Sequence, residues 1–261
     1  MSERDRSPRA RLEAVLLDAG GTLIRLDFEW MAETVSALGT RVSAAALRRG
    51  EVEGRRRYDR SRGDGLGPGA PRPPIATSAE IREYFTGTLE AAGVPAPLIT
   101  PALERLERRN RETGLWTRPM EGARAALDEL AGLGVRRAVV SNSDGRAERH
   151  LADCDMLRGV EFVVDSHRVG IEKPDPGIFR VALERLDVAP ERALFVGDIR
   201  SVDEAGARAA RLHFVLLDPL GDYAGPDTAA IPGMERLAGW VSDRFEIAPA
   251  HPAARPGGTK P

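Results

Sequence analysis

Four short segments carry acidic, hydroxyl, amide and lysine side chains that suit metal and phosphate chemistry. They are Asp18 followed by Gly20 and Gly21, Ser141-Asn142, Lys173-Pro174-Asp175-Pro176, and Gly197-Asp198 with Asp203 five residues later. Carboxylate oxygens are ligands that Mg²⁺ prefers, whereas a lysine and a hydroxyl can hold phosphoryl oxygens. An aspartate can also act as a nucleophile that divides phosphoryl transfer into two steps. Taken singly, the acidic segments also fit a turn or a helix N-cap, so the combination carries the prediction.

Lysine is almost absent from the chain, which draws attention to Lys173. Among 38 basic residues only Lys173 and Lys260 are lysine, and Lys260 lies in a Pro/Gly-rich C-terminal segment. The ammonium group is a compact point charge and the guanidinium a wide planar fork, so the two do not replace each other at a tight site. A single internal lysine in an arginine-rich chain therefore favours a specific role, with codon chance on a surface helix as the alternative.

The candidate residues follow short apolar runs that indicate buried strands. The runs cover Leu12–Leu17, Val135–Val140, Val160–Val164, Ala193–Val196 and Phe214–Leu217. Helical patterns lie between the later runs, at Glu121–Gly132, Arg146–Leu157, Asp175–Leu186 and Asp203–Arg211. Strands that alternate with helices predict an α/β fold with a parallel sheet covered on both faces. Because ligands bind at the carboxyl ends of such strands, the candidate residues should meet at one edge of the sheet.

The stretch from about residue 25 to residue 117 interrupts this alternation and indicates helices only. The predicted helices are Phe28–Leu38, Ala44–Arg57 capped by Ser43, Ile81–Ala91 after a Thr77/Glu80 capping box, and Leu103–Arg109 after Thr100 and Pro101. Residues 61–74 are rich in Gly and Pro and predict an irregular loop. A helical module is therefore inserted after the first strand.

Together the four segments resemble the motifs of the haloacid dehalogenase-like hydrolase superfamily, in the subgroup whose helical cap follows the first motif. Asp18-Ala19-Gly20-Gly21-Thr22-Leu23 is similar to the nucleophile motif, and the other three segments are similar to the remaining motifs in the same order. The resemblance covers residues 12 to 217 and implies a Rossmann-like doubly wound core with an inserted all-helical cap. It sets the expected boundaries: a core of residues 12–24 and 118–246, a cap of residues 25–117, and disordered tails at 1–11 and 247–261.

The resemblance also implies roles for the motif residues. Asp18 would be the nucleophile, and Lys173 would act beside it by offsetting its charge. The implied ligands are Ser141, Asn142 and Lys173 for the phosphoryl oxygens, and Asp18, the backbone carbonyl of Gly20, and Asp198 for Mg²⁺, with Asp203 supporting the metal directly or through water.

Gly20 departs from the phosphatase pattern. Phosphatases of this superfamily usually carry a second aspartate two residues after the nucleophile, as general acid and base, and here Gly20 holds that position. Loss of a positioned general acid typically costs about 10²–10⁴-fold in rate. His167 and Asp144 are candidate substitutes, with a solvated loop side chain as the alternative, and Tyr58 and Tyr84 of the insert are further candidates.

The sequence therefore predicts an Mg²⁺-dependent phosphatase that hydrolyses a small phosphorylated metabolite through an aspartyl-phosphate on Asp18. A 2-haloacid dehalogenase is the alternative enzyme, because that branch also lacks the second aspartate, but it would gain nothing from Asp198 as a metal carboxylate. A weakly active or non-catalytic ligand-binding relative is a third possibility, supported by Gly20. A phosphonate hydrolase is disfavoured because the insert contains no lysine for a Schiff base.

Composition limits the partners and the compartment. The chain has 261 residues, 38 basic and 40 acidic, hence a net charge of −2 and a pI near 6.2, which argues against a nucleic-acid binder. No apolar run approaches the roughly 18–20 residues of a membrane span, and the N-terminal segment lacks the apolar region of a secretory signal. The lone Cys154 fits a reducing compartment. We therefore expect a cytoplasmic monomer or homodimer without nucleic-acid or membrane partners.

Three further features are interpreted structurally. Arg55-Arg56-Arg57 is expected to form a solvated helix face, with an anion-facing surface of the cap as the alternative. Trp116 should pack at the hinge between cap and core. Cys154 lies on a predicted helix and is expected to be a small buried residue without a reactive thiol.

Overall fold

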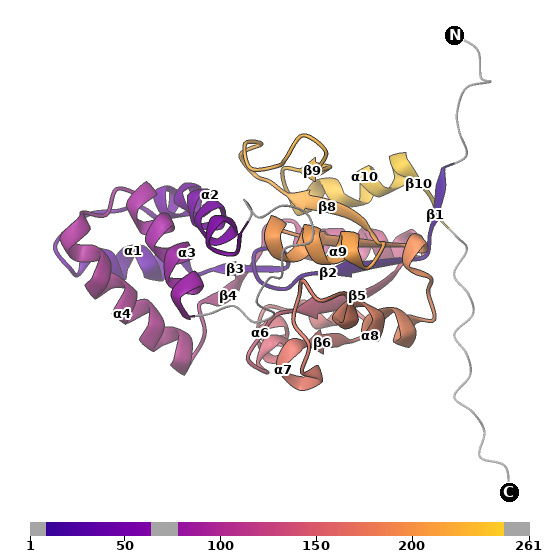
Figure 1. Ribbon diagram of the computed structural model, residues 1–261, viewed down its shortest axis with the longest axis horizontal. Coiled ribbons are helices and arrows are strands. Elements are labelled where there is room, and N and C mark those ends of the chain that lie inside the picture. The colour runs from indigo at the N-terminus through magenta and orange to yellow at the C-terminus, as the bar shows by residue number, and fades with distance from the viewer. Residues whose placement is uncertain (1–8, 64–77, 248–261) are drawn as a thin grey trace, which may run out of the picture.

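A parallel β-sheet forms the centre of the molecule in the computed structural model, which describes residues 9–63 and 78–247 (Figure 1). In this part of the chain the sheet has six strands in the order β6-β5-β2-β7-β8-β9. Their bounds are β2 Ala14–Leu17, β5 Arg136–Ser141, β6 Val163–Asp165, β7 Ala193–Gly197, β8 His213–Leu217 and β9 Ala230–Ile231. All neighbouring strands pair in parallel, which confirms the predicted sheet.

Helices cover both faces of the sheet because the strand side chains alternate between them. Val15 and Leu17 of β2 face a core shared with α5 (Ala123–Gly132) and α10 (Leu237–Arg244). Ala14 and Leu16 face a second core shared with α8 (Pro176–Leu186) and α9 (Ala205–Ala209). The shorter helices α6 (Ala147–Asp153) and α7 (Ser166–Val169) follow β5 and β6. The doubly wound α/β class is therefore confirmed.

Among the described residues, four helices form a separate module between β3 (Ile24–Leu26) and β4 (Trp116–Pro119), at the left of Figure 1. They are α1 Phe28–Ser36, α2 Ala44–Ser61, α3 Ser78–Ala91 and α4 Ala96–Glu112. The module has its own buried cluster, which includes Phe28, Met31 and Leu103. We call it the cap. It is not purely helical at its base, because β3 and β4 pair there as an antiparallel ribbon.

Two glycines allow α2 and α3 to pack closely within the cap. A Cβ atom on Gly50 would lie 2.4 Å from the carbonyl oxygen of Thr88, and one on Gly54 would lie 2.5 Å from that of Tyr84. The predicted N-cap residue of α2 is confirmed, since the Ser43 hydroxyl accepts a hydrogen bond from the Ala46 amide at 3.1 Å. The two glycines therefore set the close contact of α2 with α3 inside the cap.

The predicted start of α4 at Thr100 and Pro101 is wrong. The helix begins at Ala96, and Pro101 lies inside it. Pro97 occupies the first turn, where a missing N–H costs nothing, and Pro101 follows one turn later, near enough to the start to be tolerated. The helix predicted at Asp203–Arg211 also differs, because a π-helical turn, η3 (Arg200–Glu204), precedes the short α9.

The two ends of the described chain pair with each other. β1 (Ala10–Leu12) and β10 (Phe245–Ile247) form a parallel two-stranded sheet, so Ala10, Arg11 and Ile247 are ordered although they were assigned to the tails. Burial of Leu12 and Phe245 accounts for this pairing. The other domain limits stay a prediction, while Thr77 and residues 64–74 of the predicted loop lie outside the described residues.

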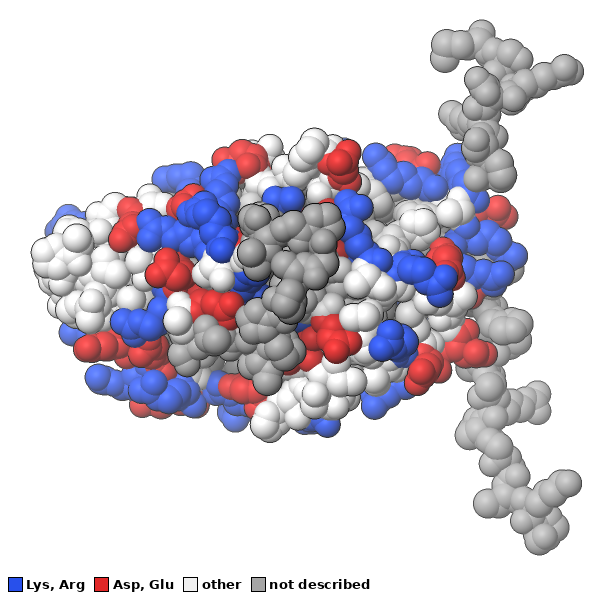
Figure 2. Space-filling model, in the orientation of Figure 1, with Lys and Arg blue, Asp and Glu red and all other residues white. Residues whose placement is uncertain are grey.

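Both charge signs are mixed on the face drawn in Figure 2, where Lys/Arg and Asp/Glu side chains are interspersed. This distribution agrees with the near-neutral composition and differs from the basic stripe of a nucleic-acid binder. Among the described residues, no helix combines the length and apolar character that crossing a bilayer requires.

Candidate active site

The sheet brings the predicted residues to one edge. Asp18 follows β2, Ser141 ends β5, and Asp198 follows β7, and these strands are direct neighbours. Lys173 reaches the same edge from the loop before α8, and Asp203 from η3. Parallel strands end on the same side, so the apolar runs that define them also place their polar successors together.

Lys173 joins two of the carboxylates. Its Nζ atom lies 2.6 Å from Oδ1 of Asp18 and 2.8 Å from Oδ1 of Asp203, and its side chain is only 2% exposed. Burial alone would lower the pKa of this ammonium group, but the charges of Asp18 and Asp203 outweigh burial and raise it. The cation also lies 5.1 Å from the ring centre of Phe195. Lys173 is therefore a fixed positive charge at neutral pH.

Asp18 is poised between two opposing influences. Burial raises the pKa of its carboxyl from 3.8 to about 6, the Lys173 ammonium opposes that rise, and the Asp203 carboxylate adds to it. The group is therefore mostly ionised at neutral pH yet poorly solvated. A desolvated carboxylate whose charge is held by one ammonium group is suited to act as a nucleophile.

Asp203 anchors the loop after β7. Its Oδ2 atom accepts hydrogen bonds from the backbone amides of Asp198 at 3.0 Å and Ile199 at 2.9 Å, while Oδ1 accepts from Lys173. Both oxygens are thus engaged within the protein. Asp203 holds Lys173 and the Asp198 loop in place, a positioning role alongside the metal support that was predicted for it.

Asp198 has one engaged and one unpartnered oxygen. Its Oδ2 atom lies 3.2 Å from Nε of Arg55, whereas the buried Oδ1 atom has no hydrogen-bond partner. Burial raises the pKa of this carboxyl, Arg55 opposes the rise, and the nearby Asp203 and Asp18 add to it. The approach of Asp198 explains Gly21, which has a φ of +81° and whose Cβ would lie 2.1 Å from Oδ2.

The three carboxylates form a set that can hold a cation. Asp18, Asp198 and Asp203 each place one oxygen within 4.8 Å of the others, and all three are buried. Hard divalent cations bind such oxygen sets, and the unpartnered Oδ1 of Asp198 is the kind of buried atom that requires a ligand. The residues present therefore fit Mg²⁺.

Arg55 is the site residue that the sequence analysis missed. The predicted solvated face is wrong for this arginine, which is 2% exposed and pairs with Glu51 at 3.3 Å as well as with Asp198. Burial opposes its charge, but Glu51 and Asp198 together raise its pKa. Arg56 and Arg57 are partly exposed, at 34% and 27% of their side chains. The one local signal was Glu51 four residues earlier, which predicts only an ion pair along the helix.

Asn142 contacts the backbone of Lys173 through its side chain. Its Nδ2 donates to the Lys173 carbonyl at 2.9 Å, and its Oδ1 accepts from the Lys173 amide at 2.8 Å. These two hydrogen bonds hold the backbone of Lys173 in place. They also occupy the side chain of Asn142, which was predicted to bind phosphate. Ser141 is 4% exposed and lines the cavity described next, together with Asp18 and Lys173.

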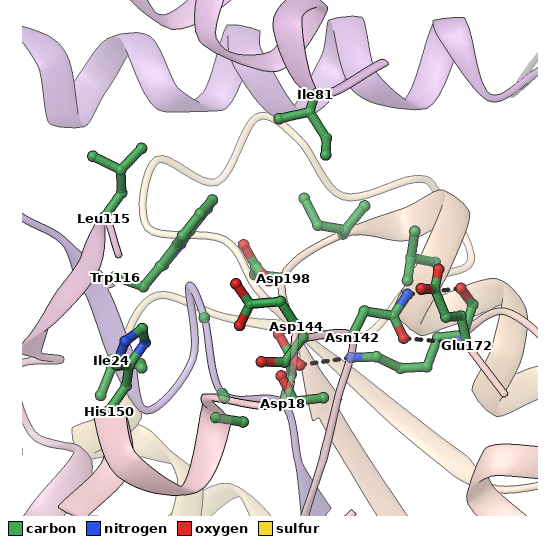
Figure 3. A pocket seen from close by; sticks show the side chains of 18 of the residues that line it. Asp18, Ile24, Ile81, Leu115, Trp116, Asn142, Asp144, His150, Glu172 and Asp198 are labelled. Carbon is green, nitrogen blue, oxygen red and sulfur yellow. Dashed lines mark hydrogen bonds and ion pairs between the residues drawn. The ribbon is translucent and has the colours of Figure 1, made fainter. Parts of the chain in front are cut away.

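The carboxylates open into a cavity of about 510 Å³ between cap and core (Figure 3). Apolar and aromatic side chains from the cap and the hinge contribute to its lining: Tyr58, Ile81, Tyr84, Phe85, Leu115 and Trp116. Figure 3 shows Ile81 and Leu115 on the side of the cavity opposite Asp18. Trp116 packs against the buried clusters of both the core and the cap, which confirms its hinge position. Its ring also closes the space beside Gly20, because a Cβ there would lie 3.0 Å from Cδ1 of Trp116.

The candidate proton donors differ in their surroundings. Asp144 lines the cavity but pairs with Arg146 at 2.5 Å, whose hydrogen bonds lower the pKa of its carboxyl. His167 is exposed and lines the cavity as predicted. His150, which the sequence analysis did not single out, also lines it and is half-buried, and this burial lowers its pKa.

The two tyrosines of the cap stay protonated. Burial raises the pKa of Tyr58 to about 12, and burial with the nearby Glu51 carboxylate raises that of Tyr84. The Tyr84 hydroxyl donates to Glu51 at 2.6 Å. Cys154 is 8% exposed and burial raises its thiol pKa, which confirms its prediction as an unreactive buried residue.

A Rossmann-like sheet, a helical cap inserted after its first strand and a carboxylate–lysine site at its carboxyl edge define a hydrolase of the haloacid dehalogenase type. The family model for haloacid dehalogenase-like hydrolases matches residues 12–211, and the chain belongs to this family.

Known proteins resemble the chain in sequence and in fold. It is 30% identical to haloacid dehalogenase-like hydrolase domain-containing protein 3 of Homo sapiens over 243 residues, 88% of this chain and 93% of the relative. Proteins of that name from Xenopus laevis and Mus musculus match over 40% and 54% of their lengths. A phosphoserine phosphatase of Thermus thermophilus is 34% identical over 158 residues, 58% of this chain and 62% of the relative. The magnesium-bound HAD-hydrolase YfnB of Bacillus subtilis shares the fold, with a TM-score of 0.59 at 19% identity over 88% of this chain and 98% of that chain.

Proposed function

We propose that this protein is an Mg²⁺-dependent phosphatase that hydrolyses a small phosphorylated metabolite through an aspartyl-phosphate on Asp18. The observation that carries the proposal is the buried Asp18–Lys173 pair, 2.6 Å apart, at the mouth of a cavity that also contains Asp198. A relative named phosphoserine phosphatase supports the reaction class. The substrate of that relative does not transfer to this chain, because the match covers 58% of it.

The residues divide the reaction between them. A carboxylate oxygen of Asp18 attacks phosphorus, the P–O ester bond breaks, and the leaving oxygen departs with the bond pair and takes up a proton. Lys173 and the Ser141 hydroxyl bind the phosphoryl oxygens, and Asn142 and Asp203 keep Lys173 in position. Water then attacks the phosphorus of the aspartyl-phosphate, which releases inorganic phosphate and restores the Asp18 carboxylate.

The metal ligands are proposed from the same geometry. Asp18, Asp198 and the backbone carbonyl of Gly20 would hold Mg²⁺, while Asp203 supports the loop that carries Asp198. When bound, the ion supplies positive charge that stabilises the charge developing on the phosphoryl oxygens.

The test is phosphate release from a panel of phosphate monoesters, measured with Mg²⁺ and with EDTA. We expect turnover of at least one ester, lost in EDTA and restored by Mg²⁺. Phosphate release that persists in EDTA would contradict the metal ligands, and its absence for every ester would contradict the phosphatase.

A second candidate function is supported by one observation. Arg55 already neutralises Asp198, so the site can keep its buried carboxylates paired without a metal. That arrangement suits metal-free displacement at carbon by Asp18, as in a 2-haloacid dehalogenase. Halide release from 2-chloropropionate in EDTA would favour this alternative, and the unpartnered Oδ1 of Asp198 argues against it.

A further inference from the structure

Arg55 is a buried cation that the cap inserts among the acidic residues of the core. It comes from the middle of α2, and its side chain is 2% exposed. Besides Asp198, it contacts Glu51 of its own helix and donates to the backbone carbonyl of Leu217 at 3.2 Å. The guanidinium therefore links the cap helix to the ends of two core strands, β7 and β8.

Contacts on both sides of Arg55 hold α2 against the core. One turn later along the helix, Asp59 accepts a hydrogen bond from the Ser201 amide at 2.9 Å and another from the Tyr223 hydroxyl. Arg56 donates to the backbone carbonyl of Asp222 at 2.6 Å. Before Arg55, Val52 packs into a small cluster with Leu216 and Tyr223. The position of the guanidinium is thus set by the docking of the whole helix.

Asp198 is the carboxylate that both Arg55 and a bound divalent ion would contact. Lys173 engages one oxygen each of Asp18 and Asp203, so among these carboxylates Asp198 is the one that Arg55 neutralises. A divalent ion bound to the free Oδ1 of Asp198 would lie close to the guanidinium on Oδ2. Like charges held on the two oxygens of one carboxylate repel each other, so each cation weakens the binding of the other.

We infer that Arg55 and the divalent metal compete for Asp198, so that docking of the cap lowers metal affinity and the metal binds most tightly when α2 withdraws. Arg55 is in this view a positioning residue that sets the affinity of the metal site. The inference rests on the metal part of the proposed function and is independent of the substrate.

The test measures Mn²⁺ binding to the full chain by isothermal titration calorimetry, without substrate. Arg55→Gln should bind Mn²⁺ at least about tenfold more tightly than the wild type, since repulsion by a unit charge is removed. Arg55→Lys, which keeps a charge on the same helix position, should stay within about threefold of the wild type. Arg57→Gln is the matched control, because it removes the same charge two residues along the helix from a partly exposed side chain that pairs with Glu90 inside the cap, and it should change the affinity by less than about twofold.

A second variant addresses docking without touching Arg55. Asp59→Asn weakens the contact with Ser201 and Tyr223, and it also removes a negative charge, which by itself would weaken metal binding. Tighter Mn²⁺ binding by Asp59→Asn therefore supports the competition, and it does so even if Arg55→Gln does not fold. Unchanged or weaker binding by folded Arg55→Gln, with a wild type that binds, would overturn the inference alone. Binding by no variant and not by the wild type would overturn the metal site as well.

Discussion

Replacement of Lys173 by methionine tests the centre of the site, because it removes the ammonium group and keeps most of the side-chain length. Two buried carboxylates, Asp18 and Asp203, then lose a partner at 2.6 and 2.8 Å. Breaking a buried ion pair by removing one partner typically costs about 4 kcal/mol. For a chain of this size, about 1 kcal/mol shifts the melting temperature by about 2–4 °C, so we expect a drop of about 8–16 °C.

The pH dependence separates this electrostatic loss from simple misfit. Burial raises the pKa of Asp18 to about 6 even with Lys173 present, and it rises further when the ammonium group is gone. A carboxyl whose folded-state pKa is raised binds protons more readily in the folded protein, so its burial cost is present at high pH and disappears as the pH falls. The difference in melting temperature between wild type and Lys173→Met should therefore be large at pH 8 and smaller at pH 5.

Scanning calorimetry at the two pH values measures the effect. Arg211→Met is the control, since it breaks an ion pair whose arginine is 76% exposed and should cost at most about 1 kcal/mol. Lys173→Arg keeps the charge but forces a larger group into the buried site, at about 1–3 kcal/mol. A Lys173→Met protein that melts with the wild type at pH 8, or loses equal stability at both pH values, would refute the reasoning.

Four activity measurements complete the set. Lys173→Arg should lose most phosphatase activity, because the fork cannot reproduce two contacts of the ammonium group; a rate within about twofold of wild type, under 0.5 kcal/mol, would contradict this. Asp18→Asn should abolish phosphate release while the far-UV circular dichroism spectrum stays unchanged, and turnover by the folded variant would exclude Asp18 as nucleophile. The kcat/KM of the wild type should fall about tenfold per pH unit below about pH 6, where Asp18 becomes protonated. A profile that stays flat down to pH 4 would contradict this role of Asp18. Gly20→Asp should raise turnover of alkyl phosphates selectively, by up to about 10²–10⁴-fold. The new side chain requires the Trp116 ring to move, so a melting curve or a crystal structure of the variant must show that it still folds.

The sequence was sufficient for the core of the site because its signals are local. An apolar run that ends at a polar residue marks the carboxyl end of a strand, and this placed Asp18, Ser141 and Asp198 at strand ends, with a glycine nearby at Asp18 and Asp198. Parallel pairing of β2 with β5 and β7 then brings these ends together without any further information. Lys173 was conspicuous as a residue type, and the structure shows the close contacts to which a lysine is suited.

The docking of the cap was not predictable in the same way. A helical pattern in α2 shows that it is a helix, but the contact of Arg55 with Asp198 joins residues 143 positions apart and depends on how cap and core meet. Three consecutive arginines have the composition of a solvated face, and Arg55 is turned inward by the docking of α2 on the core, through contacts such as that of Asp59 with Ser201. The start of α4 was predicted too late because a proline favours the first turn of a helix, whereas Pro101 is tolerated one turn inside it.

The source of the leaving-group proton follows from what fills the space beside the nucleophile. Gly20 occupies the position of the second aspartate, and the ring of Trp116 fills the space that an aspartate side chain would take. A water molecule in that space therefore does not replace the missing acid. Asp144 is a poor donor, because Arg146 lowers the pKa of its carboxyl and keeps it ionised at neutral pH.

His150 is also a poor donor, since burial lowers its pKa and favours the neutral ring. Among the named candidates that line the cavity, the exposed His167 remains, together with Tyr58 and Tyr84, whose raised pKa values make their hydroxyls weak acids. A site with so little acid catalysis works best on esters whose oxygen leaves as a stable anion. The aromatic side chains that line the cavity can pack against aryl leaving groups of this kind. We therefore expect aryl phosphates to be hydrolysed at least about a hundredfold faster than alkyl phosphates, with the ratio measured as kcat/KM on p-nitrophenyl and propyl phosphate. Equal rates in the wild type, with a selective loss of propyl phosphate hydrolysis in His167→Ala, would instead identify His167 as the acid.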